Sequence, residues 1–545
     1  MVPPDASMSA EVYADAIIAG GGVGGCAAAL ALARNGRRVV MTEETDWIGG
    51  QLTQQAVPPD EHPWIEQFGG TRAYREFRTR VRDYYRRNYP VTGRAARDPL
   101  LNPGSGSVSR LCHEPRVALA VLRDMLAPYV SNGAVTLLIE HEIIDAHGDG
   151  DVVHGVTARD LRGGREVLLR APYIIDATEL GDLLPMTGTE YVVGAEAQPD
   201  TGEMHAPSEY QPGNHQAFTY CFAMDYLHGQ DHTIDRPRDY DFWRAYTPDL
   251  APAWTGRQLA LEATHPISLE PRAYAFDPPE ESEDAVSGLW RYRRIVSRRN
   301  FVDGAFESDV CLVNWPMNDY WLGNIMEVPD AEAATHRDRG KQLSLSLLYW
   351  LQTEAPRADG GVGWKGLRLR RDVVGTTDGL AKYPYVRESR RIRAERTVVE
   401  EDVGTEARMT ATGAPREDVT SESFDDSVGV GSYRIDLHPS SGGDNYIDVS
   451  SLPFEIPLGA LIPQRVDNLI PACKNLGVTH ITNGCYRLHP VEWNIGESAG
   501  MLIAHCLATG ETPRGVRNDE GRLRDFQRFV TGQGIEIRWP RVSPR

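Results

Sequence analysis

The sequence has few lysines, no long apolar run and no paired cysteines at the spacing of a disulfide or zinc site. Only four of its 57 basic residues are lysine, whereas 77 residues are acidic, and the formal net charge is −20. Such an acidic chain argues against binding to nucleic acids or to anionic membranes. No apolar run approaches the ~20 residues that span a bilayer. The seven scattered cysteines fit a reducing compartment, and no metal site is predicted.

Residues 1–11 lack the basic segment that opens a secretion signal, so we expect a cytoplasmic protein that binds neither membrane nor nucleic acid. At 545 residues the chain is too long for one compact core, and two or three domains are predicted.

The stretch of residues 16–52 organises the rest of the chain. Residues 16–19 form a short apolar run that predicts a buried strand, and glycines follow it at the spacing G-x-G-x-x-G. Gly20 suits a tight turn, Gly22 allows a pyrophosphate to come close, and Gly25 lets helix and strand pack tightly. The helix that follows would aim free N–H groups, including that of Gly24, at phosphate oxygens. This pattern predicts a dinucleotide-binding turn.

An acid ends the second predicted strand of this unit. Glu43 follows residues 37–41 at the position where a carboxylate bonds a ribose hydroxyl, with Glu44 as the alternative. An acid here favours FAD or NAD over NADP. The next segment, Trp47-Ile48-Gly49-Gly50-Gln51, resembles the "GG" segment of FAD-dependent oxidoreductases with a glutathione-reductase-like flavin domain. The resemblance implies FAD, with Gly49, Gly50 and Gln51 along its pyrophosphate and ribityl chain.

A later segment resembles the same family. Residues 173–183 contain the pattern DATxxGDL, by which the family returns to its flavin domain, and imply that Ala177, Thr178, Gly181 and Asp182 contact the cofactor. Between the "GG" segment and residues 173–183, the sequence predicts an inserted β-meander with strands over residues 135–140, 142–147, 152–160 and 165–170.

The C-terminal part also returns to the flavin. A last strand is predicted over residues 466–473, and Pro490 is suited to the first turn of a helix. In the resembled family this helix points its N-terminus at the flavin pyrimidine, where its dipole stabilises negative charge. The cofactor-binding residues expected here are Lys474, Asn475, Pro490, Trp493 and Asn494.

With residues 384–391, four segments match in the right order, and the chain resembles bacterial FAD-dependent oxidoreductases. The resemblance implies an α/β fold: a Rossmann-type FAD-binding domain with an inserted β-meander, plus a mixed α+β substrate or cap domain. The predicted limits are 1–189 and 461–545 for the FAD-binding parts and 190–460 for the cap. Residues 52–56 contain no histidine, so the FAD is expected to be non-covalent.

Within the cap, the sequence predicts strands over residues 289–295 and 310–315 and a helix over 343–352. It also predicts an acidic loop over 278–284 and a long mobile loop within 400–430. Residues 314–321, rich in aromatic and amide groups, are predicted to line a substrate pocket.

Candidate catalytic residues gather near the C-terminal segment. His489 precedes the helix start, and His480 and His438 are the other histidines of the region; each is a candidate base or a structural residue. Glu492 is either catalytic or a charge that complements the helix dipole. Arg387, Arg390 and Arg391 either clamp a substrate carboxylate or form a solvated, ion-paired strand with Glu388.

We expect an enzyme, a FAD-dependent dehydrogenase or oxidase that removes a hydride from a small organic substrate, such as an alcohol, an amine or a secondary-metabolite intermediate. The electron acceptor stays open, with oxygen as one candidate. The alternatives are a flavin monooxygenase, which the lack of a second G-x-G-x-x-G disfavours, and a flavoprotein whose FAD is structural.

Overall fold

A five-stranded parallel sheet forms the centre of the part that contains the glycine turn. The computed structural model describes residues 10–278, 288–540 and 542. Neighbouring strands of the sheet are all parallel, in the order β23-β8-β2-β3-β4. Their bounds are β2 Ala16–Ala19, β3 Val39–Glu43, β4 Val135–Ile139, β8 Tyr173–Asp176 and β23 Leu469–Pro471. The inner strands are buried on both faces, which is why they are continuous apolar runs rather than alternating ones.

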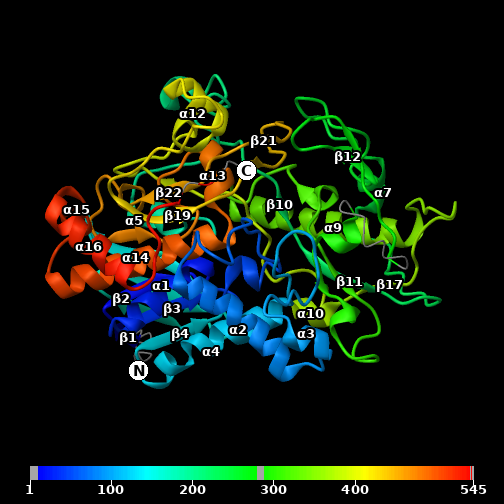
Figure 1. Ribbon diagram of the computed structural model, residues 1–545, viewed down its shortest axis with the longest axis horizontal. Coiled ribbons are helices and arrows are strands. Elements are labelled where there is room, and N and C mark those ends of the chain that lie inside the picture. The colour runs from blue at the N-terminus through cyan, green and yellow to red at the C-terminus, as the bar shows by residue number, and fades with distance from the viewer. Residues whose placement is uncertain (1–9, 279–287, 541, 543–545) are drawn as a thin grey trace, which may run out of the picture.

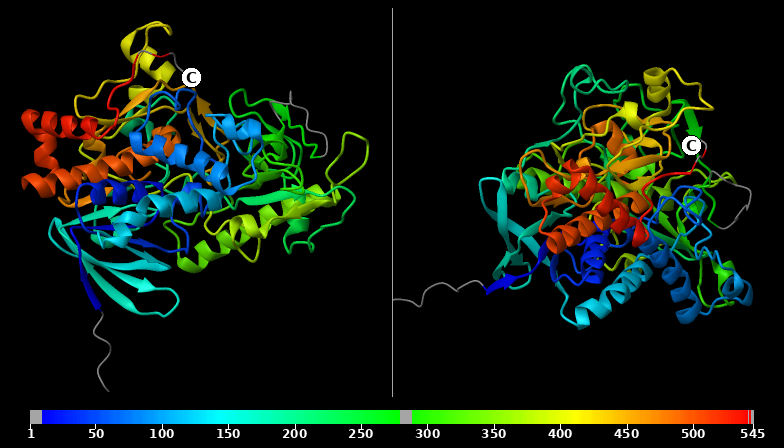
Figure 2. Two further views of the ribbon diagram at one scale, coloured as in Figure 1. Left: turned by 60° about the horizontal axis from the view of Figure 1, so that its bottom comes forward. Right: turned by 60° about the vertical axis from the view of Figure 1, so that its left-hand side comes forward.

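A second sheet of four strands contains the β-meander. The strands β5 His141–Asp149, β6 Val152–Asp160 and β7 Glu166–Arg170 are antiparallel, and β1 Ala10–Tyr13 adds in parallel to β7. This sheet is seen at the lower left of the left-hand view in Figure 2. The strand predicted over residues 135–140 was wrongly assigned to the meander. It is β4, which pairs with β3 at the edge of the parallel sheet after the crossover through helix α4 Pro115–Ser131.

Helices α1 Val23–Arg34 and α14 His489–Thr509 cover the parallel sheet side by side (Figure 1). Their contact is close enough to need glycine. A Cβ at Gly496 would lie 2.1 Å from the carbonyl oxygen of Gly24, and one at Gly500 would lie 2.6 Å from that of Ala28. The chain's C-terminal part is thereby packed against its first helix.

The cap has its own sheet and core. Strands β14 Arg294–Val296, β15 Val310–Val313, β11 Phe222–Tyr226 and β17 Leu367–Leu369 form an antiparallel sheet in that order. Helix α9 Asp330–Thr353 packs against the cap and contains the predicted 343–352 helix (Figure 1, right). The strand predicted over residues 289–295 was partly wrong, because its first half is the short helix α8 Leu289–Tyr292, which buries Leu289 and Trp290 in the cap core.

Two further β-pairs pack on the core that contains the parallel sheet. Strands β20 Ile435–Leu437 and β21 Ile447–Val449 form one pair, and β19 Ser427–Gly431 and β22 Phe454–Pro457 form the other. Within residues 400–430, the predicted long loop corresponds to residues 413–426, which form no helix or strand. The residues before it fold as α11 Glu400–Val403 and α12 Thr405–Thr412. Apart from Pro278, the acidic loop predicted over 278–284 lies outside the described residues.

The remaining elements are shorter or lie outside the sheets named above. The helices are α2 Arg72–Asn88, α3 Gly93–Arg97, α4 Pro115–Ser131, α5 Leu183–Thr187, α6 Gln198–Thr201, α7 Tyr240–Ala245, α10 Arg371–Val374, α13 His480–Tyr486, α15 Pro513–Asn518 and α16 Glu520–Gly532. The strands are β9 Tyr191–Val192, β10 Phe218–Thr219, β12 Glu262–Thr264, β13 Pro271–Ala273, β16 Asp319–Tyr320 and β18 Arg391–Ile392. Among the described residues, no helix combines the length and apolar character needed to cross a lipid bilayer.

Candidate functional site

The glycine turn lies where β2 ends, and close contacts require glycine at Gly20, Gly24 and Gly25. Gly20 has φ +97°, a left-handed conformation that favours glycine, and a Cβ there would lie 2.2 Å from the Ala177 carbonyl oxygen. At Gly24 a Cβ would lie 1.7 Å from the carbonyl oxygen of Ala472, and at Gly25 it would lie 2.2 Å from that of Gly20. The turn is therefore held between the ends of β2, β8 and β23.

Glu43 ends β3 beside this turn. Its Oε2 accepts the N–H of Gly21 at 3.1 Å, and its Oε1 accepts the N–H of Thr45 at 2.8 Å and the side-chain amide of Gln54 at 3.1 Å. Burial raises the pKa of Glu43 to about 7, although these hydrogen bonds favour the charged form. Glu44, the alternative acid, is exposed but also lines the crevice beside the turn. Both acids therefore lie beside the turn, and Glu43 bonds it directly.

The "GG" segment lies directly against the glycine turn. The N–H of Gly49 donates to the carbonyl of Gly21 at 2.7 Å, and a Cβ at Gly50 would lie 3.0 Å from the Cα of Gly22. Both Gly49 and Gly50 have positive φ. Two segments that sequence reasoning assigned to the same cofactor are thus adjacent in space.

A narrow crevice, which we call the glycine crevice, separates this turn from the end of β8. Gly20 and Gly22 lie on one side and Ala177 and Thr178 on the other. Sequence reasoning missed several other lining residues, which are Thr42, Gln54, His141, Ile143, Glu179 and Tyr383. The crevice has the features a dinucleotide needs: a glycine turn, a helix N-terminus and an acid at the end of the second strand.

The end of β8 is fixed by hydrogen bonds of its own. The hydroxyl of Thr178 donates to Asp176 at 2.7 Å and accepts the N–H of Asp182 at 2.7 Å. Gly181 has φ +67°, and the Asp182 carboxylate pairs with Arg390 at 3.1 Å. Asn475, which follows β23, donates its side-chain amide to the carbonyl of Asp176 at 3.1 Å.

Buried charges meet behind the turn. The ammonium of Lys474 pairs with Glu179 and is fully buried. Glu492 accepts the N–H of Gly24 at 3.4 Å and the side-chain amide of Gln51 at 2.5 Å. Burial raises the pKa of Glu492 to about 7, against the attraction of Lys474. Glu492 thus contacts both the first turn of α1 and the "GG" segment.

His489 begins α14 and is fully buried. Its Nδ1 accepts the N–H of Asp60 at 3.1 Å, and its Nε2 donates to the carbonyl of Val57 at 3.2 Å. Burial lowers the pKa of His489 to about 4, so the ring is neutral. Both ring nitrogens are thus committed to backbone groups of residues 57–60.

The other predicted residues of this helix make contacts inside the protein. Pro490 occupies the first turn, as predicted. The Trp493 ring lies against Tyr74 and Phe77 of α2, and the side-chain amide of Asn494 donates to the Val430 carbonyl at 3.1 Å.

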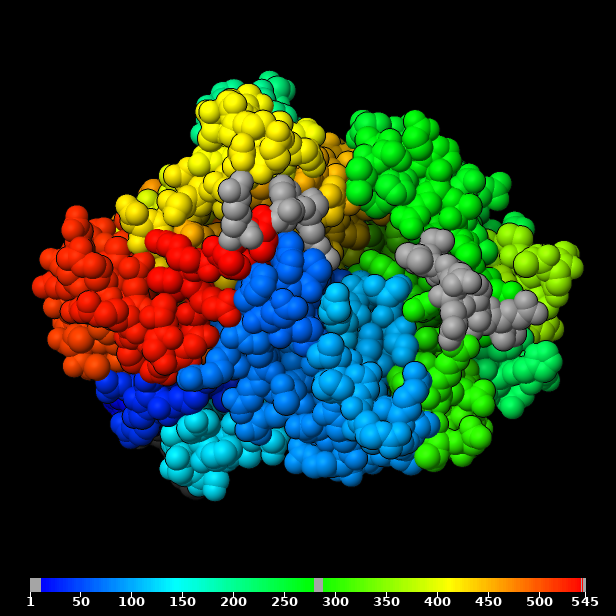
Figure 3. All heavy atoms as spheres, in the orientation of Figure 1, coloured from blue at the N-terminus to red at the C-terminus, as the bar shows by residue number. Residues whose placement is uncertain are grey.

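A cavity of about 280 Å³ lies between the flavin part and the cap, and we call it the aromatic cavity. Figure 3 shows the surface hollowed between the green part of the chain and the neighbouring orange-yellow part. As predicted, the loop after β15 lines it, through Asn314, Trp315 and Pro316. The other lining residues are Asp60, Pro266, Arg272, Tyr274, Leu289, Tyr292, Arg293, Tyr385, Arg387, Tyr433, Arg434, Asp436, His438, Tyr446, Asp448 and Arg487.

Two wall residues connect this cavity to the segments assigned to the cofactor. The carbonyl oxygen of Arg487 accepts the side-chain amide of Gln51, from the "GG" segment, at 2.8 Å. The backbone N–H of Asp60 donates to His489 at the start of α14. The aromatic cavity therefore adjoins the region where the resemblance places the flavin.

One wall of the cavity carries a histidine held by a buried acid. His438 Nδ1 lies 2.6 Å from Oδ2 of Asp319, whose Oδ1 accepts from Arg387 at 2.9 Å. Burial alone would raise the pKa of Asp319, but Arg387 and His438 lower it below its ordinary value. A charged Asp319 keeps the proton on Nδ1 and leaves Nε2 able to accept one. Arg387 pairs with Asp319, and Arg391 is the arginine of this segment that pairs with Glu388, at 2.7 Å. That ion pair is buried rather than solvated as predicted.

Sequence reasoning missed most of this wall, although one signal was present. In Arg434-Ile435-Asp436-Leu437-His438, polar and apolar residues alternate, which puts all three polar side chains on one face of β20. Across the strand pair Asp436 lies opposite Asp448, which Arg434 neutralises. Burial and the neighbouring Asp436 raise the pKa of Asp448 to about 6. The alternation identifies the polar face but not what it faces.

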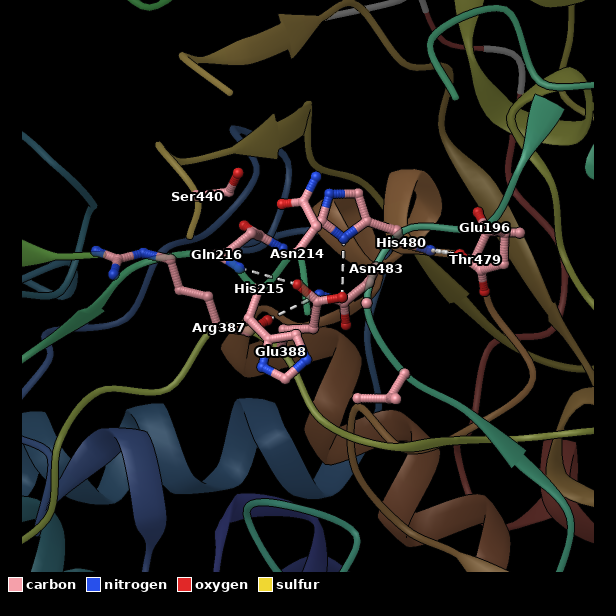
Figure 4. A network of polar contacts seen from close by, with 12 residues as sticks. Glu196, Asn214, His215, Gln216, Arg387, Glu388, Ser440, Thr479, His480 and Asn483 are labelled. Atoms are coloured by element: carbon pink, nitrogen blue, oxygen red, sulfur yellow. Dashed lines mark hydrogen bonds and ion pairs between the residues drawn. The ribbon is translucent and has the colours of Figure 1, made fainter. Parts of the chain in front are cut away.

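His480 lies in a different place, in the network of Figure 4. Its Nδ1 bonds Glu388 at 2.8 Å, and Glu388 also pairs with Arg391 at 2.7 Å. Figure 4 shows Arg387 and Glu388 pointing away from each other, and Asn483 donates to the carbonyl of Arg387 at 2.7 Å. The network holds the backbone from which Arg387 reaches the aromatic cavity, and His480 is not among the residues that line that cavity.

Comparison with known proteins gives a family and distant structural likenesses. The profile of the family described as "FAD dependent oxidoreductase" matches residues 15–530. No significant match was found among curated proteins. A geranylgeranyl bacteriochlorophyll reductase-like protein from Thermoplasma acidophilum is 10% identical, with a TM-score of 0.34, over 96% of this chain and 84% of that chain. The anhydrotetracycline hydroxylase OxyS from Streptomyces rimosus is 10% identical, with a TM-score of 0.34, over 96% and 69%.

L-proline dehydrogenase from P. horikoshii is 15% identical, with a TM-score of 0.19, and the match covers 34% of this chain and only 25% of that chain. The TM-scores of all three structures are below 0.5, so the likeness is distant.

Proposed function

The chain belongs to the FAD dependent oxidoreductase family, and from that premise we propose that it oxidises a small organic substrate in the aromatic cavity by removing a hydride. The observation that carries the proposal is the Asp319–His438 pair on the cavity wall. A substrate that loses a hydride from carbon must also lose a proton from its hydroxyl or amino group, and His438 is placed to accept that proton.

We propose that the glycine crevice and the segments beside it hold FAD, with Glu43 at the adenosine ribose and the N-terminus of α1 at the pyrophosphate. The close glycine contacts and the N–H groups around Glu43 support this assignment. When bound, FAD supplies the hydride acceptor. The residues of this chain supply orientation and shielding. The crevice orients the cofactor, and the cap covers the cavity from the opposite side.

The groups around His438 have distinct roles in this proposal. Asp319 orients the ring, so that Nε2 is the nitrogen that takes the substrate proton. Arg387 stabilises the buried charge of Asp319, which makes Arg387 a positioning residue rather than the substrate clamp considered from sequence. Asp436 lies 3.6 Å from His438 Nε2 and pairs with Arg487 at 3.2 Å, so it can stabilise the ring once it is protonated.

Anaerobic mixing of the purified enzyme with alcohols, amines and hydroxy acids tests the proposal, because flavin bleaching reports hydride transfer directly. In the His438→Asn variant we expect the bleaching rate to fall by about 10²–10⁴-fold, with FAD still bound. The control is His154→Asn, the same change at an exposed position of β6. A bleaching rate unaltered by His438→Asn would remove the assigned base, and bleaching only on addition of NAD(P)H would favour a monooxygenase.

A further inference from the structure

The hydroxyl of Thr219 lies between the two side chains behind His438. Its Oγ1 is 2.5 Å from Oδ1 of Asp319 and 2.9 Å from Nη1 of Arg387. Thr219 is fully buried, and Asp319 and Arg387 are each 1% exposed. The partners of the Asp319 carboxylate are therefore protein groups rather than solvent.

The direction of each of these hydrogen bonds follows from the groups involved. A guanidinium only donates, so the Thr219 oxygen accepts from Arg387 and its single proton goes to Asp319. Oδ1 of Asp319 thus accepts two bonds, from the Thr219 hydroxyl and from Nη2 of Arg387 at 2.9 Å. Oδ2 is left for Nδ1 of His438, at 2.6 Å. The two bonds on Oδ1 determine how the carboxylate is turned, and so they aim Oδ2 at the histidine ring.

The two terminal nitrogens of Arg387 are occupied inside the protein. Nη1 donates to Thr219 and to the carbonyl of Ala217 at 2.8 Å. Nη2 donates to Asp319 and to the side-chain oxygen of Asn314 at 3.3 Å. These bonds use all the protons of the two nitrogens. Arg387 therefore acts on the site through Asp319 and Thr219.

The backbone around Thr219 holds the same side chains in register. Thr219 of β10 is the cross-strand partner of Asp319 of β16. Its N–H donates to the carbonyl of Tyr385 at 3.0 Å, and its carbonyl accepts the N–H of Tyr385 at 2.8 Å, in the segment that carries the arginine. Nearby, the side-chain oxygen of Gln216 accepts the N–H of His438 at 3.3 Å. One short stretch of chain thus positions the acid, the arginine and the histidine.

We propose that Thr219 is a positioning residue for the proton acceptor. Its hydroxyl turns Asp319 so that Oδ2 keeps a proton on Nδ1 of His438 and leaves Nε2 able to take the proton of the substrate. The inference rests on the proposed function, because it takes His438 as the base. Thr219 is not among the residues that line the aromatic cavity, so it acts through Asp319, and its own proton stays in place.

The test uses the FAD-loaded full-length enzyme and Thr219→Val, which removes the hydroxyl and keeps the shape of the side chain. Proton NMR detects the N–H that His438 donates to Asp319 as a downfield signal, and the loss of this signal in His438→Asn assigns it. We expect Thr219→Val to shift or abolish the signal and to slow anaerobic flavin bleaching by about tenfold or more. Thr219→Ser, which keeps the hydroxyl, should keep the signal and most of the rate.

A second pair of variants isolates the hydroxyl if valine is not accommodated. Thr219→Ser and Thr219→Ala both lack the methyl group and differ only in the hydroxyl, so alanine should lose what serine keeps. The matched control is Thr189→Val, which removes a buried hydroxyl that bonds Thr187 at 2.8 Å outside the aromatic cavity. It should leave the signal and the rate unchanged. An unaltered signal and rate in Thr219→Val, or equal losses in the serine and alanine variants, would overturn the inference.

The NMR signal needs no turnover, so it separates this inference from the proposed function. A signal that responds to Thr219→Val, in an enzyme whose bleaching is unaffected by His438→Asn, would support the orienting role of Thr219 and refute His438 as the base. Slow bleaching in His438→Asn together with an unaltered signal and rate in Thr219→Val would refute only the role of Thr219.

Discussion

At the scale of single residues, Glu43 connects the end of β3 to the glycine turn that follows β2. It accepts N–H groups from Gly21 and Thr45, so its carboxylate is held at the mouth of the glycine crevice. Its pKa of about 7, raised from 4.5 chiefly by burial, makes its charge depend on pH near neutrality.

We expect Glu43→Gln to weaken FAD binding by about tenfold or more, because a charge-assisted hydrogen bond to the ribose is lost. In the wild type, the fraction of ionised Glu43 rises as the pH rises through about 7. The affinity of the apoprotein for FAD should therefore increase between about pH 6 and pH 8 and stay flat in the variant. Fluorescence titration with FAD measures both, and Glu44→Gln serves as the control. An effect of Glu44→Gln alone would transfer the role to Glu44.

His489 is predicted to behave differently from His438. Both of its nitrogens bond backbone groups, so His489→Asn should leave one or both of these groups unpaired. We expect the free energy of unfolding to fall by about 1–3 kcal/mol, while flavin reduction stays within about tenfold of the wild type. Chemical denaturation and stopped-flow absorbance measure the two quantities. A drop of 10²-fold or more in the reduction rate at unchanged stability would instead restore His489 as the base.

At the scale of elements, the contact between α1 and α14 determines whether the two ends of the chain form one site. The helices approach so closely that glycine is needed at Gly496 and Gly500. This contact brings Glu492, near the start of α14, to the first turn of α1.

Gly496→Ala should destabilise the enzyme by about 1–3 kcal/mol, because the added methyl group would lie 2.1 Å from the Gly24 carbonyl oxygen. The displaced α1 should also retain less FAD during purification. Gly532→Ala is the matched control, because a Cβ at this exposed helical position meets no neighbouring atom. It should be neutral or slightly stabilising. Thermal melting and the flavin-to-protein absorbance ratio give the comparison, and equal behaviour of both variants would argue against the close helix contact.

At the scale of the whole molecule, the residues assigned to FAD come from three distant parts of the chain. Residues 20–51, 176–182 and 474–494 meet at the carboxyl ends of parallel strands, with the cap on the other side of the aromatic cavity. A ligand at this junction would hold together segments that are otherwise far apart in sequence.

We expect the enzyme to purify with one FAD per chain, and acid precipitation to release all of it, because residues 52–56 offer no histidine for a covalent bond. Restoring FAD to the apoprotein at 100 times its dissociation constant should stabilise the fold by about 2.7 kcal/mol, which raises the melting temperature. Flavin that stays in the acid pellet, or a melting temperature indifferent to FAD, would contradict this prediction.

The sequence alone predicted the α/β fold with its parallel sheet and the glycine turn. The spacing of Gly20, Gly22 and Gly25, the acid Glu43 and the "GG" segment could be predicted because each reflects a local steric or charge requirement. These residues lie within about thirty positions of one another, so their arrangement follows from one strand–turn–helix–strand unit.

Only the tertiary structure decided which histidine faces the aromatic cavity. Asp319 and His438 are 119 residues apart in the sequence, and Arg387 lies between them, 68 residues after Asp319. Sequence reasoning favoured His489 because it stands beside the helix start, yet burial commits that ring to the backbone of residues 57–60. The alternation around Asp436 and His438 marks a polar face, but what a face meets depends on how the cap folds back over the flavin part, and no local pattern encodes that contact.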